Sequence, residues 1–245
     1  VLEVGLGGLY DSTNVVDPLI TVLTQVEFEH QDVLGSTLEE ILSNKLGIMK
    51  RGVTMIVSPQ KFDVTNQIEE KAKELDAEIV CVDEKYDLEK ITVDGTFFEQ
   101  HQIRMIGTPY ILSVKTALKV CSELLNDFDE NLFWEAVKEV TLPGRFEVFN
   151  KDGKYVIFDM AHTIEGAKYL RSTLDELFPN QKLSFLISML KDKDVENFTK
   201  ELINEVDEVV VTQATIPRAI AAKQLAEQIE HDSQVISDPI EAFNN

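Results

Sequence analysis

Three short stretches of the sequence carry residues that could take part in metal or phosphoryl chemistry. The first stretch, residues 3–14, begins with Glu3 on a segment that reads as a buried strand and continues into a glycine-rich loop. The carboxyl ends of strands in an open α/β sheet form the ligand crevice, so we expect Glu3 to meet a divalent cation or a ligand there. The structural alternative is a tight turn whose glycines supply positive φ, with Glu3 paired to a nearby base.

The second stretch supplies His30, just after a predicted strand over residues 18–25, and Lys45 on the helix that follows. A neutral imidazole at this place could bind a metal ion beside Glu3, although a lone loop histidine is commonly only solvated. Lys45 lies among apolar residues of its helix, so its amine could be partly desolvated and neutral. A neutral lysine amine can add carbon dioxide and become a carbamate, which is an extra anionic oxygen ligand.

The third stretch combines Arg145, in a Pro-Gly-Arg-Phe-Glu segment, with Asp159 and His162 at the end of a predicted strand. An arginine at a domain junction can place its planar, permanently charged fork on a phosphate. Asp159 could accept from ribose hydroxyls, and His162 could donate to a phosphate or a carboxylate. A buried structural pair, Arg145–Glu147 or Arg145–Asp159, is the alternative.

The pattern of apolar residues predicts an α/β chain of two domains, divided at Thr141-Leu142-Pro143-Gly144, where a helix breaker meets a turn former. Ser36-Thr37-Leu38-Glu39 has the form of a capping box that opens a helix. Residues 91–106 alternate around Asp94-Gly95 like a β-hairpin. The remaining elements are strands over 1–4, 18–25, 53–57, 78–82, 154–160, 182–189 and 207–213, with helices over 36–49, 64–76, 110–126, 129–139, 164–178, 195–205 and 217–230.

Composition excludes several classes of protein. Asp and Glu number 44 against 23 Lys and Arg, and a net charge of −21 repels nucleic-acid phosphates and anionic bilayers. Cys81 and Cys121 lack the spacing of a disulfide scaffold or a zinc site, which favours a reducing cytoplasm. No apolar run approaches the roughly 18–20 residues that span a bilayer. We therefore expect a cytoplasmic protein that binds neither nucleic acid nor membrane.

Read in order, the three stretches resemble the folylpolyglutamate/dihydrofolate synthase branch of the Mur ligase superfamily. The matching segments run from position 3 to position 219: EVGLGGLYDSTN (3–14), FEHQDVLGSTLEEILSNKLGIMKRG (28–52), PGRFE (143–147), DMAHTIEG (159–166), LKDKD (190–194) and PRA (217–219). Their order and spacing are far more specific than any single motif, and they favour the functional reading of Glu3 over the structural one.

The resemblance implies a P-loop-type ATPase domain, with a parallel sheet and a small β-hairpin insertion, followed by a Rossmann-like domain; here these would be residues 1–140 and 141–245. It implies ATP-dependent ligation of L-glutamate to a folate or dihydropteroate carboxylate through an acyl phosphate, with Mg²⁺ as the metal, and the chain is taken to be a monomer. The implied metal ligands are Glu3, His30 and a carbamylated Lys45. The implied catalytic residues are Lys45, Arg145 and His162, and Arg145 and Asp159 would face the nucleotide.

The sequence departs from the family pattern at several places. Leu9 stands where the family has arginine, Glu29 replaces the aspartate before the histidine, and Ser113 replaces an asparagine expected near the nucleotide base. The EKAG segment reads Asn44-Lys45-Leu46-Gly47, and DGAHNP reads Asp159-Met160-Ala161-His162-Thr163-Ile164. These changes spare the predicted metal and catalytic residues but alter their surroundings, which indicates changed substrate choice or a decayed paralogue.

The P-loop pattern G-x-x-x-x-G-K-[ST] occurs nowhere in the sequence, and Val1 lies inside what reads as a strand. We therefore expect an N-terminally truncated ligase that does not turn over ATP by itself, with a C-terminal domain that could be incomplete. Two other functions stay open at this point: a Mur-type ligase that joins an amino acid to a nucleotide-linked peptide, and a non-catalytic paralogue with a binding role.

Overall fold

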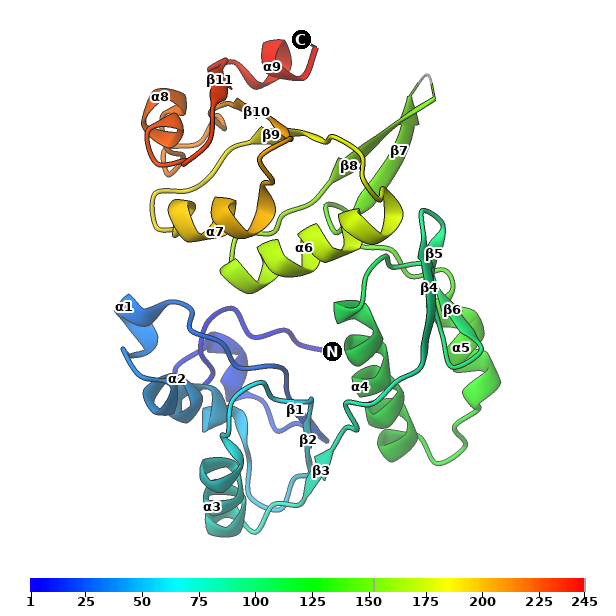
Figure 1. Ribbon diagram of the computed structural model, residues 1–245. Helices are drawn as coiled ribbons and strands as arrows, with labels where there is room; N and C mark the ends of the chain where they lie inside the picture. Colours follow the sequence, from blue (N-terminus) through cyan, green and yellow to red (C-terminus); the bar gives the residue numbers. More distant parts are fainter. Residues whose placement is uncertain (152, 245) are drawn as a thin grey trace. The chain divides into compact units, whose positions relative to one another are not determined.

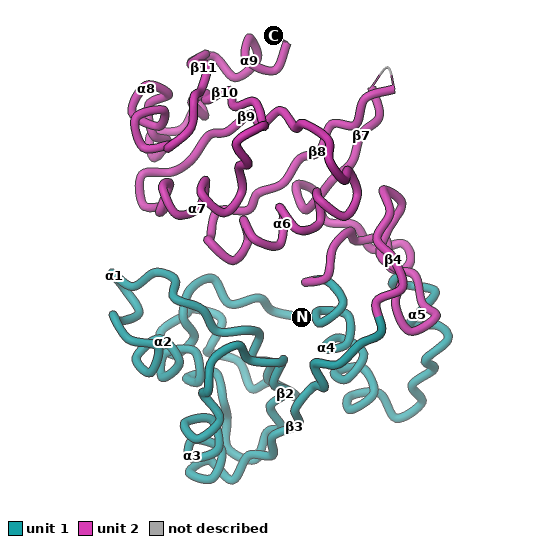
Figure 2. Tube along the Cα trace, in the orientation of Figure 1, with its two compact units in different colours: residues 1–87, 110–137 teal, residues 88–109, 138–245 magenta. Residues whose placement is uncertain are grey.

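The computed structural model describes residues 1–151 and 153–244. The chain separates into two compact units, which Figure 2 distinguishes by colour: Val1–Asp87 with Tyr110–Val137, and Leu88–Pro109 with Lys138–Asn245. Each unit contains a three-stranded parallel sheet and a hydrophobic core of its own. The predicted domain limits, 1–140 and 141–245, stay a prediction.

The first unit is built on a parallel sheet in which the strands lie in sequence order, β1-β2-β3. Its core is formed by the buried faces of α2 and α3 against β2, with Ile41, Leu42 and Met55 fully buried. The elements are β1 (Thr21–Leu23), β2 (Met55–Val57), β3 (Ile79–Cys81), α1 (Gln31–Leu34), α2 (Leu38–Lys45), α3 (Thr65–Leu75), α4 (Pro109–Leu124), α5 (Glu130–Val137) and the 3₁₀ turns η1 (Ser12–Val15) and η2 (Leu46–Ile48).

Two predictions for this unit are wrong in detail. Residues 1–4 form no strand, and Leu2 and Glu3 are exposed, because no strand among the described residues pairs with this segment. The capping box of α2 is formed by Thr37 and Glu40, one residue later than the sequence pattern suggested. The Thr37 hydroxyl accepts from the Glu40 N–H, and the Glu40 carboxylate accepts in return from the Thr37 N–H.

The second unit combines three sheets. Its parallel sheet has the order β11-β10-β9, and helices α6 and α7 run side by side on one side of it (Figure 1). An antiparallel sheet joins β4, β5 and β6, and an antiparallel pair joins β7 and β8. The elements are β4 (Leu88–Thr92), β5 (Gly95–Phe98), β6 (His101–Ile103), β7 (Glu147–Lys151), β8 (Lys154–Phe158), β9 (Ser184–Ile187), β10 (Glu208–Val211), β11 (Ser233–Val235), α6 (Ile164–Leu177), α7 (Val195–Leu202), α8 (Ala222–Ala226) and α9 (Pro239–Asn244).

Here too the structure corrects the sequence analysis. The predicted hairpin over 91–106 is three-stranded. The predicted strand over 154–160 is β8, and it pairs antiparallel with β7, which the sequence analysis missed, instead of joining the parallel sheet. The predicted helix over 217–230 is only α8. Strand β11 and helix α9 were also missed.

A buried ion pair stabilises the second unit. Arg171 of α6 donates to Asp207 over 3.0 Å, and the Asp207 carboxylate also accepts from the backbone N–H groups of Leu183 and Asn204. Asp207 is buried, so its charge depends on these donors. None of the helices in the described part of the chain has the length and hydropathy needed to cross a membrane.

Candidate active site

The glycine-rich loop of the first unit is organised by one carboxylate. Asp11 Oδ2 accepts from the backbone N–H groups of Gly5 and Leu6, both at 3.1 Å, and Oδ1 accepts from the Thr13 N–H at 2.9 Å and the Thr13 hydroxyl at 2.6 Å. These bonds, that from the Thr13 hydroxyl most of all, lower the pKa of Asp11 from 3.8 to about 2. The ionised Asp11 carboxylate therefore holds the two ends of the loop, residues 5–6 and Thr13, together.

The same loop packs tightly on the carboxyl end of α2. The Leu9 N–H donates to the Asn44 carbonyl at 2.9 Å, and the Asn14 amide donates to the Gly47 carbonyl at 3.0 Å. A Cβ at position 8 would lie 2.8 Å from the Lys45 carbonyl oxygen, and a Cβ at position 47 would overlap Leu9 Cα and lie 2.7 Å from the Leu9 nitrogen. Because neither glycine has a Cβ, the two backbones can approach this closely, and the loop is held against the backbone of Lys45.

The three predicted metal ligands all lie in the first unit. Lys45 is the last residue of α2 and is half-buried, with its carbonyl beside Gly8. His30 precedes α1 with a left-handed backbone, φ 52°, and its Nε2 lies 3.4 Å from a Glu29 carboxylate oxygen. Glu3 is exposed, two residues before the loop that Asp11 closes. The loop and α2 are thus held together, whereas Glu3 and His30 lie on irregular segments.

A carboxylate and an imidazole are donors that a divalent metal can use, and Mg²⁺ usually takes one or two protein ligands and fills its sphere with water and substrate phosphates. No group of three or more His, Cys, Asp or Glu residues in the described ranges could hold a metal ion. Glu3 and His30 carry donor atoms of the kinds that a divalent metal accepts, and their role as ligands stays a prediction.

The pH dependence of the loop follows from the lowered pKa of Asp11. Because that pKa is about 2 in the folded chain and 3.8 without its partners, the stabilisation is fully present above about pH 4 and is lost as the pH falls towards 2. Amide hydrogen exchange of residues 5–13, compared between wild type and Asp11→Asn, should show wild-type protection converging on that of the variant over this range. Equal protection at pH 6 would contradict the assignment.

In the second unit, a sharp turn presents Arg145. Gly144 and Phe146 both have a left-handed backbone, φ 71° and 46°, which is rare for a bulky residue such as phenylalanine. Four hydrogen bonds hold the turn. The Phe146 N–H donates to Asp159 Oδ2 at 2.8 Å, the Met160 N–H to the Gly144 carbonyl at 2.9 Å, the Gly144 N–H to Glu147 Oε2 at 3.0 Å, and the Arg145 N–H to the Leu142 carbonyl at 3.1 Å. Strain of this kind persists where the surroundings impose it, and it is common at functional sites.

The structure brings Arg145, Asp159 and His162 to neighbouring segments of this unit. Arg145 is exposed, and neither ion pair offered as its structural alternative, with Glu147 or with Asp159, is formed within residues 1–151 and 153–244. Asp159 accepts from the N–H groups of Phe146 and Ala161, at 2.8 and 2.7 Å. His162 Nδ1 lies 3.0 Å from the Met160 carbonyl oxygen. Asp159 thus positions the arginine turn, and its contact with a nucleotide stays a prediction.

Two later motifs that the sequence analysis quoted also lie together. Leu190 and Ala219 form a β-bridge, the Lys191 N–H donates to the Arg218 carbonyl at 3.0 Å, and the Arg218 guanidinium donates to Asp192 at 3.0 Å. These two motifs, residues 190–194 and 217–219, therefore contact each other directly in the fold.

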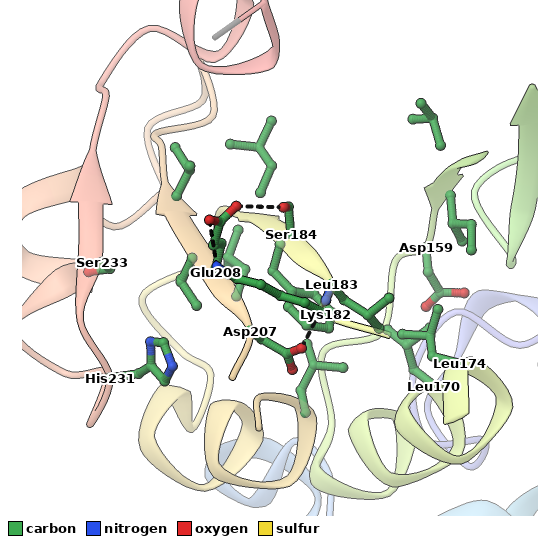
Figure 3. A pocket seen from close by; sticks show the side chains of 18 of the residues that line it. Asp159, Leu170, Leu174, Lys182, Leu183, Ser184, Asp207, Glu208, His231 and Ser233 are labelled. Carbon is green, nitrogen blue, oxygen red and sulfur yellow. Dashed lines mark hydrogen bonds and ion pairs between the residues drawn. The ribbon is translucent and has the colours of Figure 1, made fainter. Parts of the chain in front are cut away.

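A groove of about 2010 Å³ in the second unit runs between β8 and the parallel sheet. Figure 3 shows Lys182 and Ser184 both bonded to Glu208 in this groove, with Asp159 on the side away from His231. The bonds from Lys182 and then Ser184 lower the pKa of Glu208. Arg145 and His162 do not line the groove, so it is not where the predicted phosphate chemistry converges.

Sequence reasoning quoted Asp11 and Gly47 without giving them a role. The signal for Asp11 was local, because an aspartate two residues before a threonine commonly accepts from that residue's N–H. Gly47 gave no such signal, since its contact with Leu9 joins segments 38 positions apart in sequence.

Comparisons with known proteins agree with the ordered motifs. Residues 144–245 match the family model described as Mur ligase, glutamate ligase domain. The dihydrofolate synthase/folylpolyglutamate synthase of Bacillus subtilis (strain 168) is 29% identical over 245 residues, covering 94% of this chain and 57% of the relative. The chain thus spans little more than half the length of that relative. The predicted resemblance and the α/β fold class are confirmed.

Two solved structures extend the comparison to the fold. A Mycobacterium tuberculosis folylpolyglutamate synthase complexed with ADP is 26% identical, with a TM-score of 0.87 over 98% of this chain and 58% of that one. A bifunctional folylpolyglutamate synthase/dihydrofolate synthase from Yersinia pestis c092, complexed with AMPPNP and Mn ion, is also 26% identical, with a TM-score of 0.79 over 98% of this chain and 58% of that one. The similarity therefore includes both compact units.

Proposed function

We propose that this chain, which carries a Mur ligase glutamate ligase domain in residues 144–245 and is similar over nearly its whole length to dihydrofolate synthase/folylpolyglutamate synthases, serves the ATP-dependent ligation of L-glutamate to a folate or dihydropteroate carboxylate. The γ-phosphoryl group of ATP passes to the carboxylate, which gives an acyl phosphate and ADP. The glutamate amine then attacks the acyl carbon and releases phosphate.

The observation that carries this proposal is the match of motif order, identity and fold across both units. Relatives with the same arrangement have been seen with ADP, or with AMPPNP and Mn ion, which supports ATP as the phosphoryl donor and a divalent metal, Mg²⁺ in the cell. When bound, such a metal would supply positive charge against the charge that develops on the transferred phosphoryl group.

Residues of this chain are assigned roles in that reaction. Glu3 and His30 would hold the metal, together with a carbamylated Lys45 whose backbone the loop of Gly8 fixes. Arg145 would donate its guanidinium fork to phosphate oxygens, which suits an exposed arginine on a turn that Asp159 and Glu147 hold rigid. His162 would donate a proton or hydrogen bond to phosphate or carboxylate oxygens. Asp159 would contact the nucleotide as well as position the turn.

We further propose that the protein works as a monomer in the cytoplasm and binds neither nucleic acid nor membrane. The net charge of −21 supports this, because it repels both kinds of polyanionic surface. The free cysteines, Cys81 and Cys121, are consistent with a reducing compartment. Sedimentation of the purified gene product tests the monomer directly.

The test of the proposed function is ADP release by the full-length gene product with ATP, Mg²⁺, L-glutamate and either dihydropteroate or tetrahydrofolate. Release should require both the pterin substrate and glutamate. Arg145→Gln should lower kcat/KM for ATP about 100-fold, since it removes a charged fork from the phosphates. Arg51→Gln is the matched control, because Arg51 is exposed and lies outside the proposed site. Equal activity of the two variants would contradict the role of Arg145 in binding the phosphates.

A further inference from the structure

Residues 88–109 lie between two parts of the first unit in the sequence, yet they belong to the compact second unit (Figure 2). They form the three-stranded sheet β4-β5-β6, and we call them the strap. The roles proposed above use none of its residues, and the domain limits predicted from the sequence place it in the first domain. The chain passes from one unit to the other three times, after Asp87, Pro109 and Val137.

Side chains of the strap are part of a hydrophobic core of the second unit. Ile106 is 6% exposed and belongs to one buried cluster with Phe146 and with Leu174 of α6. Gly107 lies beside the same helix, since a Cβ added at this position would be 3.1 Å from the Thr173 hydroxyl oxygen, and β4 also contacts α6. The strap and α6 thus share one core, and opening either of them exposes apolar surface of the other.

A buried hydroxyl fixes the end of the strap to its middle strand. Thr96 of β5 is fully buried, and its hydroxyl donates to the Met105 carbonyl and accepts from the Gly107 N–H, both at 2.9 Å. Phe98 of β5 and Ile103 of β6 are fully buried as well. Gly107 therefore keeps its place for as long as the strap stays folded.

The links that leave the strap and the second unit differ in slack. Residues 138–143, which lead from α5 into the second unit, are all exposed. In contrast, Thr108 alone separates Gly107, which is buried and bonded in the strap, from Pro109, the first residue of α4. The start of α4 is thus tied to the strap by a link with almost no slack.

We propose that the strap folds and unfolds as part of the second unit and passes each opening of that unit to the first turns of α4. While the second unit is folded, the bonded Gly107 holds the start of α4. When the unit opens, Gly107 is released and the start of the helix frays. The inference goes beyond the proposed function, because it holds whether or not the chain serves a ligase.

Hydrogen exchange of the intact chain, followed by mass spectrometry at increasing urea concentration, tests the shared unfolding. Residues 95–107 should lose protection at the same urea concentrations as β9 and β10, and β2 reports on the first unit. Loss of protection in residues 95–107 together with β2 alone, or before either unit opens, overturns the proposal.

Two destabilising substitutions show which unit the strap follows. Asp207→Ala removes the buried partner of Arg171 and should raise exchange in β10 and in residues 95–107 alike, about 100-fold. Gly47→Ala, in the first unit, should raise exchange in β2 and leave residues 95–107 unchanged. If Asp207→Ala does not fold, Val211→Ala makes a milder cavity in the core of the second unit and takes its place. Equal changes in all the segments in either variant would contradict the proposal.

The response of α4 tests the coupling. In Asp207→Ala, exchange of residues 113–116, near the start of α4, should rise together with that of the strap. Residues 121–124, at the end of the helix, should keep wild-type exchange. Unchanged exchange of residues 113–116 while the strap opens would refute the coupling.

A longer link separates coupling through the strap from a general loss of stability. With Gly-Gly inserted between Gly107 and Thr108, residues 113–116 should exchange at the same rate in the wild-type and Asp207→Ala backgrounds. The matched control inserts the same pair between residues 140 and 141, in the exposed link, and should keep the difference between the two backgrounds. If both insertions give the same result, the coupling does not run through the strap.

Discussion

Replacing Gly47 with alanine is expected to destabilise the first unit by about 1–3 kcal/mol and to lower ADP release by the full-length gene product about 100-fold. The added methyl group would overlap Leu9 Cα and lie 2.7 Å from the Leu9 nitrogen, so the glycine-rich loop must move away from α2. Because the loop also contacts the Lys45 carbonyl through Gly8, its displacement disturbs the surroundings of Lys45. Urea unfolding and the coupled ADP assay measure the two effects.

The matched control is Gly52→Ala in the same unit. Gly52 has a left-handed backbone, φ 69°, but no atom lies within 4 Å of an added Cβ. The Gly52→Ala variant should lower the free energy of unfolding by about 1–2 kcal/mol through backbone conformation alone and leave ADP release unchanged. If Gly47→Ala retains full activity, the contact between loop and helix has no bearing on the site.

Replacing Asp207 with alanine is expected to destabilise the second unit by about 3–5 kcal/mol, since it leaves Arg171 buried with a reduced set of partners. It also removes the acceptor of the Leu183 and Asn204 N–H groups. Nε of Arg171 already lacks a hydrogen-bond partner within the described residues, so the loss of Asp207 would leave a second part of the buried guanidinium with fewer acceptors. Chemical unfolding followed by far-ultraviolet circular dichroism measures the loss.

Asp175→Ala tests the same arginine from its exposed side. Asp175 also pairs with Arg171, at 2.5 Å, but its side chain is 55% exposed, so its removal should cost less than about 1 kcal/mol. Equal losses in the two variants would show that burial of Asp207 does not set the strength of the pair.

Local signals predicted much of the fold. Helices α3, α4 and α6 lie close to their predicted ranges, because apolar periodicity and caps such as Thr163 act within one element. Strands depend on partners, and there the sequence was a poorer guide. Residues 1–4 have the composition of a strand but no neighbour in the described structure, and β7, Glu147–Lys151, is a strand by virtue of its pairing with β8.

For the site, residue types were predicted more readily than contacts. Arg145 and Asp159 were both predicted to face the nucleotide. In the structure, one Asp159 oxygen accepts from the Phe146 N–H of the arginine turn and the other accepts from the Ala161 N–H.

The most direct test of the central claim is mass spectrometry of the products formed by the full-length gene product from ATP, Mg²⁺, L-glutamate and dihydropteroate or tetrahydrofolate. The account predicts a new pterin species heavier by one glutamate residue, formed together with an equal amount of ADP and abolished when ATP is omitted. A pterin substrate of unchanged mass, in a folded protein that is given each folate in turn, would contradict the account.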